Sequence, residues 1–386
     1  MPKELTRGSA VRFVVLMGVI SLLADVTYEG ARSISGPYLS LLGASGAVVG
    51  FVAGFGELVG YGLRLLSGIL ADRTQRYWLI TFFGYAINLL AVPALALAGH
   101  WQIAAALLVT ERVGKAIRTP ARDAMLSHAT AKTGHGWGFG LHEAMDQIGA
   151  VLGPTLMAGA LYLHKGYQRG FAFLLIPALL ALACLTVARI LFPDPRDFEI
   201  KKAEFKSEGL PRAFWIYLIA AACVAAGYAD FPLIAYHLKL KSIAADDVIP
   251  LLYALAMGVD AIAALVFGRW FDRRGIFVLI PAAVLSSLFA PFVFMGNETL
   301  AMIGMGLWGI GMGAQESVMR AAVATMVSPE KRGSAYGIFN AAYGAMWFAG
   351  SAAMGALYDV SIPALVIFSV VLQLLSIPFF LKASHR

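Results

Sequence analysis

The sequence predicts an all-α polytopic membrane protein that crosses the bilayer twelve times. Two observations predict this. Only 14% of the 386 residues are charged and 59% are hydrophobic, whereas soluble domains average about 25% charged residues. The apolar residues fall into runs of about 20 or more, the length that a helix needs to cross about 30 Å of hydrocarbon. Because lipid offers no partner for unpaired backbone groups, and the alternating pattern of barrel strands is absent, we expect the spans to be helices.

Twelve apolar runs follow one another along the chain. They are residues 11–41, 46–70, 78–98, 101–127, 137–163, 168–192, 213–238, 247–270, 276–296, 299–327, 334–358 and 361–382. Several exceed about 25 residues, which indicates tilt or extension beyond the bilayer. The first run follows a basic flank, but Asp25 and Glu29 interrupt it and no small-residue cleavage site follows. We therefore interpret it as a retained first helix and not as a signal peptide.

The distribution of Lys and Arg predicts the orientation of the spans. The even-numbered connections carry Arg73, Arg76, Lys132, a cluster from Arg196 to Arg212, Arg273, Arg274, Lys331 and Arg332, and the odd-numbered ones only Lys165, Arg169, Lys239 and Lys241. Since basic loops stay in the cytoplasm, we expect both termini to be cytoplasmic, in a bacterial inner membrane. The pI of about 9.4 follows from this topology and does not indicate nucleic-acid binding.

Two short phrases indicate an internal repeat. GILADRTQR at 68–76 follows the second span, and GRWFDRRG at 268–275 follows the eighth. Three residues match at a constant offset of 200: Gly68, Asp72 and Arg73 with Gly268, Asp272 and Arg273. We predict two pseudo-symmetric six-helix bundles, at 1–192 and 213–386, joined by a polar cytoplasmic linker at 193–212. Repeats of this kind are typical of secondary transporters.

GILADRTQR also resembles the loop signature of the major facilitator superfamily, G-x-L-A-D-R-x-G-R-R/K. The match includes Arg76 but has Gln75 where the family prefers Gly, and Tyr77 in place of the last basic residue. With the twelve spans and the repeat, the resemblance covers essentially the whole chain. It implies the superfamily's fold and transport by alternating access around a central site.

Span five contains a pattern that resembles the antiporter signature of exporters in this superfamily. Its spacing is G-x8-G-x3-G-P, at Gly140, Gly149, Gly153 and Pro154, with Met-Ala at 157–158 instead of the usual trailing Gly-Gly. Glycines let a neighbouring helix approach closely, and the Gly-Pro pair is expected to bend the helix. The alternative is a generic glycine-rich membrane helix.

Span four contains the densest charge, in the phrase ERVGKAIRTPARDAML at 111–126. The phrase resembles bacterial permeases of the superfamily with a GKGIRTxPRDAL-like segment, a subgroup without a settled substrate. Leu108 and Arg112 resemble a proton-linked arginine motif, although Lys-Ala at 115–116 replaces the usual Gln-Gly.

Charged residues recur at helical spacing within the N-terminal spans. They are Asp25, Glu29 and Arg32 in span one, Glu57 and Arg64 in span two, Glu111, Arg112, Lys115, Arg118 and Arg122 in span four, and Glu143 and Asp146 in span five. A charge at the centre of a span costs about 2.5–3.5 kcal/mol on insertion scales, so such residues normally face a cavity or a partner. We expect these side chains to pair with one another inside a polar cavity.

Five of them are predicted to couple transport to protons: Asp25, Glu29, Glu57, Glu111 and Arg112. At 1.5 Å per residue, Asp25 lies about 20 Å into span one, near the midplane. A conformational change that exchanges a desolvated environment for one beside an arginine would load and release a proton. Asp25 and Glu57 are the leading carriers. The alternative is that these residues are static, paired structural charges.

Other polar residues are candidates for lining the substrate cavity. They are Arg32, Arg64, Lys115, Glu143, Asp146, Gln315, Glu316, Asn340 and Tyr343. Arg118 and Arg122 lie nearer the cytoplasmic end of span four, where they either anchor the helix at the headgroups or form gating pairs with Glu143 or Asp146. For His142, also near that end, we favour solvation.

The repeated loop phrases also predict a conformational latch, formed by Gly68, Asp72, Arg73 and Arg76 and by Gly268, Asp272 and Arg273. In a pseudo-twofold arrangement, Asp72 would face the start of span eleven, and Asp272 the start of span five. A carboxylate at a helix N-terminus gains about 0.3–1 kcal/mol from the helix dipole. The two contacts would hold the cytoplasmic side shut.

The sequence thus favours a proton-coupled exporter, an antiporter, of a small amphipathic or organic-anion substrate. A uniporter or proton symporter that imports an anionic metabolite, and a flippase for a lipid-like molecule, remain alternatives. Metal-ligand spacing, a phosphate loop and a nucleophile–base pair are absent from the sequence, so we expect no enzymatic activity, cofactor or metal. The expected partners are a small-molecule substrate, protons and membrane lipid, without nucleic acid, and the expected state is a monomer.

Overall fold

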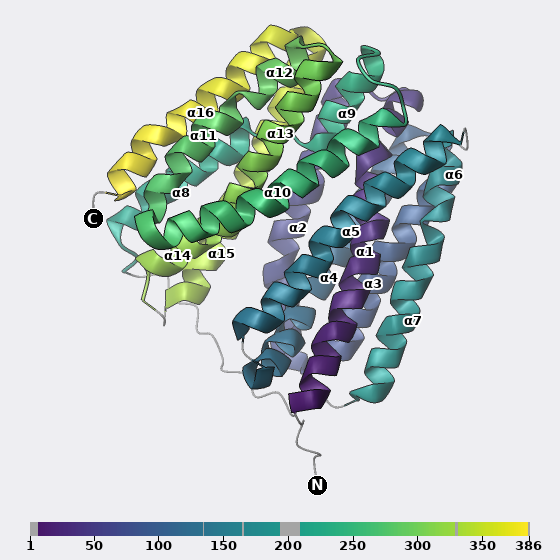
Figure 1. Ribbon diagram of the computed structural model, residues 1–386, viewed down its shortest axis with the longest axis vertical. Coiled ribbons are helices and arrows are strands. Elements are labelled where there is room, and N and C mark those ends of the chain that lie inside the picture. Colours follow the sequence, from purple (N-terminus) through teal and green to yellow (C-terminus); the bar gives the residue numbers. More distant parts are fainter. Residues whose placement is uncertain (1–6, 134, 164–165, 194–208, 329–330, 385–386) are drawn as a thin grey trace. The chain divides into compact units, whose positions relative to one another are not determined.

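A computed structural model describes residues 7–133, 135–163, 166–193, 209–328 and 331–384, and these residues form helices and their connections (Figure 1). In chain order the elements are α1 (Arg7–Leu41), α2 (Gly46–Thr74), α3 (Tyr77–Ala94), η1 (Leu95–Leu97), α4 (Trp101–Thr133), α5 (His135–Tyr162), α6 (Gly166–Phe173), α7 (Leu175–Leu191), α8 (Arg212–Gly227), α9 (Phe231–Leu240), α10 (Val248–Arg274), η3 (Gly275–Val278), α11 (Leu279–Ser287), α12 (Phe289–Met295), α13 (Glu298–Ala314), η4 (Gln315–Met319), α14 (Arg320–Met326), α15 (Arg332–Val360) and α16 (Ile362–Ser384).

Every predicted span corresponds to one of these helices or to a helix with a break. Within the described residues, seven stretches are long and apolar enough to cross a membrane by length and composition alone: Gly8–Leu41, Gly46–Thr74, Tyr77–Leu97, Gly166–Leu191, Arg212–Leu240, Val248–Met295 and Ile362–Ser384. The stretch Val248–Met295 contains two predicted spans. The helix α4 falls outside this set because its charged stripe interrupts every apolar window. The all-α polytopic fold class is therefore confirmed.

The helices group into two compact units. The first comprises Met1–Ile34 and Val59–Lys202, and the second comprises Ser35–Leu58 and Ala203–Arg386. The end of α1 and the start of α2 therefore belong with the C-terminal residues by their contacts. The predicted linker at 193–212 lies largely outside the described residues, and the predicted domain boundaries stay predictions.

Glycines set the contact between α3 and α4 in the first unit. A Cβ at Gly84 of α3 would lie 2.5 Å from the backbone nitrogen of Arg118, and one at Gly114 of α4 would lie 2.3 Å from that of Asn88. Real Cβ atoms do not approach this closely, so only glycine allows the two backbones to touch. This close packing, typical of small residues in membranes, places the polar side chains of α4 deep inside the unit.

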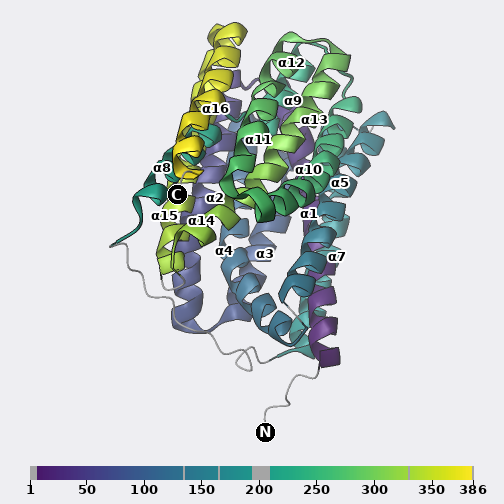
Figure 2. The same cartoon turned by 60° about the vertical axis from the view of Figure 1, so that its left-hand side comes forward.

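Span seven is not one continuous helix. It consists of α8 and α9, which are separated by extended backbone at Tyr228 and Asp230. Pro232, in the first turn of α9, has no N–H to donate and so favours a helix start there. The backbone oxygen of Gly227 accepts hydrogen bonds from Ser369 Oγ at 2.6 Å and Gln373 Nε2 at 3.2 Å. Both donors belong to α16, which packs along α8 in both views (Figures 1 and 2). The break is thus satisfied inside the protein, as lipid requires.

Span ten contains a second irregularity. Residues Gln315–Met319 form the π-helix η4 between α13 and α14. The Tyr217 hydroxyl donates to the backbone oxygen of Met319 at 2.8 Å, and Ser317 Oγ donates to Gly313 O at 2.5 Å. Single π-turns of this kind are frequent at functional sites, and this one carries two of the predicted cavity residues, Gln315 and Glu316.

Candidate functional site

The charged stripe of α4 faces α1 inside the first unit. The carboxylate of Asp25 on α1 is 5% exposed, and its Oδ1 atom has no hydrogen-bond partner among the described residues. Lys115 of α4 places its ammonium 3.8 Å from the centre of the Tyr28 ring, a cation–π contact. The charges of Lys115 and Asp25 act on each other. An acidic side chain of α1 and a basic side chain of α4 therefore lie close enough to interact electrostatically.

The helix α5 approaches this place through the predicted glycine pattern. A Cβ at Gly149 would lie 2.5 Å from Leu22 O and 2.8 Å from the Cβ of Asp25, and one at Gly153 would lie 2.6 Å from Val26 O. Gly149 and Gly153 thus permit direct contact between α5 and α1. Gly140 has no neighbour within 4 Å of the same position, so the expected close approach is wrong for this glycine, which lies where α5 faces open space.

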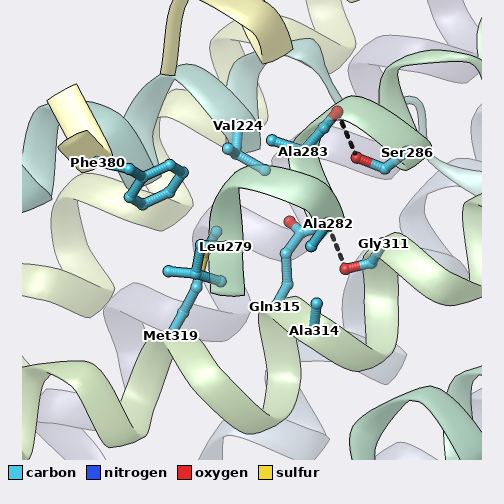
Figure 3. A pocket seen from close by; sticks show the side chains of 10 residues that line it. All are labelled: Val224, Leu279, Ala282, Ala283, Ser286, Gly311, Ala314, Gln315, Met319 and Phe380. Carbon is cyan, nitrogen blue, oxygen red and sulfur yellow. Dashed lines mark hydrogen bonds between the residues drawn. The ribbon is translucent and has the colours of Figure 1, made fainter. Parts of the chain in front are cut away.

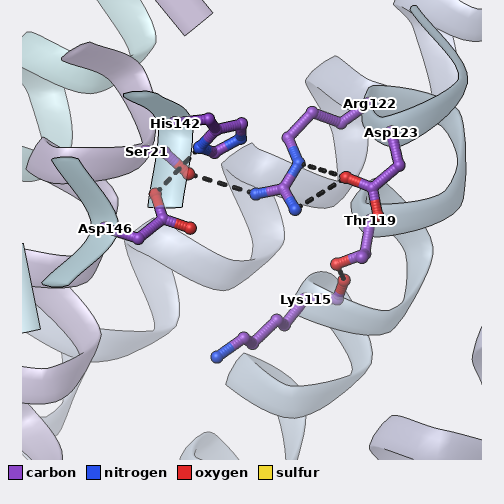
Figure 4. Close-up of polar contacts among 7 residues, drawn as sticks. All are labelled: Ser21, Lys115, Thr119, Arg122, Asp123, His142 and Asp146. Carbon is purple, nitrogen blue, oxygen red and sulfur yellow. Dashed lines mark hydrogen bonds and ion pairs between the residues drawn. The ribbon is translucent and has the colours of Figure 1, made fainter. Parts of the chain in front are cut away.

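A chain of polar side chains links α5, α1 and α4 further along the same helices (Figure 4). The Nδ1 atom of His142 lies 3.1 Å from Asp146 Oδ1. Arg122 donates from Nη1 to Ser21 Oγ at 3.1 Å and pairs through Nη2 with Asp123 at 2.8 Å. Ser21 lies between Asp146 and Arg122 (Figure 4). The predicted gating pair of Arg122 and Asp146 therefore has a serine hydroxyl between its members, and its gating role stays a prediction.

His142 is 4% exposed, so the expected solvation of this residue is wrong. Its position along the chain indicated contact with water, but the side chain is buried beside Asp146 of the same helix. The spacing of His142 and Asp146, at i and i+4, puts both on one face of α5. That signal was present in the sequence. Glu143, on another face of α5, is exposed.

Headgroup anchoring is also wrong for Arg118. Its side chain is 1% exposed, and its guanidinium lies 4.2 Å from the centre of the Tyr85 ring and 5.9 Å from that of Tyr28. The Nε and Nη1 atoms have no hydrogen-bond partner within the described part of the chain. The glycine contact of α3 with α4 carries this arginine inward, although the residue count placed it near the membrane edge.

Glu111 and Arg112 pair with each other. Arg112 Nε lies 3.3 Å from Glu111 Oε2. The amide of Asn88 on α3 donates to Glu111 Oε1 at 2.6 Å and to Glu111 O at 3.1 Å. Both carboxylate oxygens of Glu111 therefore have partners, as expected of a static structural charge.

The remaining predicted charged and loop residues differ in their surroundings, and the charge of Glu29 acts on Asp25 and Lys115. Arg64 places its guanidinium 5.2 Å from the centre of the Tyr61 ring. Arg32 and Glu29 lie on α1, Glu29 buried and Arg32 partly so. The loop residues Asp72, Arg73 and Arg76, and their counterparts Asp272 and Arg273, are exposed, while Gly68 and Gly268 are partly buried. The predicted role of these residues as a latch stays a prediction, as does the coupling role of Glu57, which belongs to the second unit.

In the second unit, an aromatic cluster surrounds the break in span seven. Trp308 Nε1 donates to Ala229 O at 2.9 Å, and the Tyr228 hydroxyl donates to Trp308 O. Asp230 Oδ2 accepts from Trp347 Nε1 and from Ser351 Oγ, each at 2.8 Å. Trp347 and Ser351 stand at i and i+4 on α15, a spacing that puts both donors on one helix face and that was visible in the sequence.

Four of the predicted cavity residues lie on α15 and η4. The Tyr343 hydroxyl donates to Gln315 Oε1 at 2.7 Å, and Gln315 Nε2 donates to Gly311 O at 3.1 Å. Asn340 is partly exposed and Glu316 is exposed. A cavity of about 10 Å³ adjoins Gln315 and Ser286 (Figure 3), which is room for about one water molecule. It is too small for a substrate.

No three His, Cys, Asp or Glu side chains gather as metal ligands would in the described part of the chain. The arrangement instead comprises buried charges at helix contacts, glycine-mediated packing and two interrupted spans. Together these features define an integral membrane protein of the transporter class.

The sequence matches the Major Facilitator Superfamily over residues 15–351, with a second match over 231–386. The chain belongs to this family, and it is therefore a secondary transporter of a small molecule and not, by family, an enzyme. An uncharacterized protein of Mycobacterium tuberculosis is 43% identical over 376 residues, covering 96% of this chain and 92% of the relative. An uncharacterized MFS-type transporter of Methanocaldococcus jannaschii is 26% identical over 379 residues, covering 94% and 92%.

Solved structures share the fold. A POT family transporter in complex with 5-aminolevulinic acid has a TM-score of 0.77 at 12% identity, covering 96% of this chain and 95% of that one. The nucleoside transporter NupG has a TM-score of 0.67 at 12% identity, covering 96% and 97%. At these identities the likeness shows the fold alone.

Proposed function

We propose that the protein is a proton-coupled antiporter that exports a small amphipathic substrate, and that Asp25 binds the coupling proton. The observation that carries the proposal is the buried Asp25 carboxylate, 5% exposed, with its Oδ1 atom unpartnered among the described residues. An ionised carboxylate is costly in such a place. Protonation removes that cost. A change to a better solvated environment would again favour the ionised carboxylate and release the proton.

Asp25 is preferred to Glu111 because the surroundings of the two carboxylates differ. Asn88 and Arg112 occupy both oxygens of Glu111, so binding a proton there would break two existing contacts. Asp25 has an oxygen available and a basic neighbour, Lys115. The contact at Gly149 places α5 directly against Asp25, so a movement of α5 relative to α1 would change how well the carboxylate is solvated.

The direction of coupling depends on the charge of the substrate. A neutral or cationic amphipathic molecule that occupies the space beside ionised Asp25 competes with the proton, and competition for one group gives antiport. An organic anion would bind Lys115 instead, and it would bind best when Asp25 is protonated. The same pair of residues therefore supports a second candidate function, proton symport of an anionic metabolite.

The proposal places both termini in the cytoplasm, in a bacterial inner membrane, with a monomer as the working unit. The bias of Lys and Arg toward even-numbered connections supports this orientation. The glycine pattern in α5, of which Gly149 and Gly153 contact α1, supports export.

The test uses purified protein in proteoliposomes that contain a pH-sensitive dye. Substrates are first found by thermal-shift screening of amphipathic cations, neutral compounds and organic anions. In the wild type, outward substrate flow should drive protons inward. Asp25→Asn should retain substrate exchange between the two sides of the vesicle but lose proton movement. Glu298→Gln, a change at an exposed carboxylate in the first turn of α13, should behave as the wild type.

Retained exchange shows that Asp25→Asn still folds and binds. Proton movement that persists in this variant would refute the role of Asp25. Protons that move in the same direction as substrate would refute antiport and support the symport alternative, and an absence of proton movement in the wild type would indicate a uniporter.

A further inference from the structure

Asp359, near the end of α15, caps the start of α2. Its Oδ1 atom accepts a hydrogen bond from Gly46 N at 2.9 Å, and its Oδ2 atom accepts one from Ala47 N at 2.8 Å. The first four N–H groups of a helix have no partner within the helix. The Ser45 hydroxyl accepts a hydrogen bond from Val48 N at 3.3 Å. Asp359 supplies the acceptors for the two preceding N–H groups, those of Gly46 and Ala47. The contact joins residues more than 300 positions apart, within the second unit.

A stripe of small residues continues this contact along both helices. Gly46, Gly50 and Gly54 recur every four residues on α2, and Ser351, Gly355 and Asp359 do so on α15. A Cβ at Gly50 would lie 2.4 Å from Ser351 O, and one at Gly355 would lie 2.7 Å from Gly46 O. The two backbones are therefore in direct contact, and any larger side chain would separate them.

Aromatic side chains flank the stripe on one side. The ring of Phe348 on α15 lies edge-on to Phe51 at 5.4 Å and packs on Phe55 at 6.0 Å between ring centres. The capping carboxylate, the small-residue stripe and the aromatic contact all join the same two segments, 46–55 and 348–359.

We infer that Asp359 is a gating residue, which latches α2 to α15 where α2 begins and must release its two hydrogen bonds when the transport pathway opens there. The sequence repeat assigns α2 and α15 to different halves of the chain. Alternating access moves such halves apart at one membrane face at a time. The inference rests on transport by alternating access and not on proton coupling.

The sequence repeat predicts a counterpart of this latch at the opposite end of the same two helices. Asp72 stands near the end of α2, as Asp359 stands near the end of α15. Asp72 is predicted to face the start of α15. In the reciprocal scheme each helix uses a carboxylate at its end to hold the start of the other. The two ends open in alternation. A weaker latch at one end should therefore favour the state in which that end is open and the other end is closed.

The test measures how fast a buried thiol at the latch is labelled. Cys184 and Cys223, the two native cysteines, are replaced by Ser. Ser351→Cys then introduces a probe at a position that is 1% exposed beneath α2. A membrane-impermeant maleimide is added to the full chain in lipid vesicles without substrate or a pH gradient, so failure of proton coupling would leave this assay intact.

Asp359→Asn should raise the labelling rate about two- to fivefold, since loss of a charge from a helix N-terminus shifts a conformational equilibrium by about that factor. Asp72→Asn should lower the rate by a similar factor. Asp246→Asn, which removes the charge of a carboxylate that pairs with Lys239 at 2.5 Å, is the matched control and should leave the rate unchanged.

General destabilisation would raise the rate in both latch variants, so their opposite signs separate gating from unfolding. A rate in Asp359→Asn equal to that of the control would overturn the latch. A rise in Asp72→Asn would overturn the reciprocal scheme.

Discussion

Gly149→Ala should push α5 away from α1, although the change adds only one methyl group. The new Cβ would stand 2.5 Å from Leu22 O and 2.8 Å from the Cβ of Asp25. Ordinary contact between such atoms needs about 3.5 Å, the separation at which dispersion attraction is best, so the helices must separate by about 1 Å. Overpacking of this kind costs about 1–3 kcal/mol.

The matched control is Gly140→Ala in the same helix, where nothing lies within 4 Å of the new atom. Both changes replace Gly by Ala in a helix, which favours the helix by about 0.5–1 kcal/mol. That gain cancels when the two variants are compared. The free energy of unfolding of Gly149→Ala should therefore be lower than that of Gly140→Ala by about 1–3 kcal/mol.

The assay is thermal unfolding of both purified variants in detergent, with substrate exchange as a second measurement. Gly149→Ala should melt at a lower temperature and exchange substrate more slowly, because it displaces the backbone beside Asp25. Equal melting of the two variants, or slower exchange in Gly140→Ala alone, would refute the argument that close packing is the reason for glycine at position 149.

Two further predictions concern buried polar side chains of the first unit. His142→Gln and Asp146→Asn should each lower the free energy of unfolding by about 1–3 kcal/mol. The double variant should lower it by less than the sum of the two, because each single change already removes the contact between the two side chains. Additive shifts in melting temperature would show that the pair at 3.1 Å is not coupled. Tyr85→Phe should leave the free energy of unfolding nearly unchanged, since the Tyr85 hydroxyl makes no hydrogen bond in the described residues. Tyr85→Leu removes the ring beside the Arg118 guanidinium and with it a cation–π contact of up to about 2 kcal/mol. Equal unfolding temperatures for the two variants would contradict this.

The positions of the spans were predictable because the bilayer leaves the chain little choice. A run of apolar residues in lipid must be a helix, so hydropathy alone locates it. Breaks within spans were not predictable in this way. Tyr228 and Ala229 are as compatible with a membrane helix as their neighbours, and the interruption depends on Gln373 and Ser369, donors from a distant part of the sequence.

The candidate site was predictable as a set of helix faces but not as pairs. Spacing placed Asp25 and Lys115 on stripes that could meet, since periodicity determines which side chains share a face. It could not say how closely the helices approach. The glycine at position 84 buries Arg118, and the contact of Asp359 with α2 joins segments whose proximity no local pattern encodes.

The interrupted backbone of span seven has a consequence for biogenesis. Gly227 exposes its oxygen early in the second half of the chain, but the donors that satisfy it are 142 and 146 residues further along. Until span twelve emerges from the ribosome and enters the membrane, that oxygen must be kept in contact with water or with the insertion machinery. We therefore expect stable insertion of span seven to depend on the presence of span twelve.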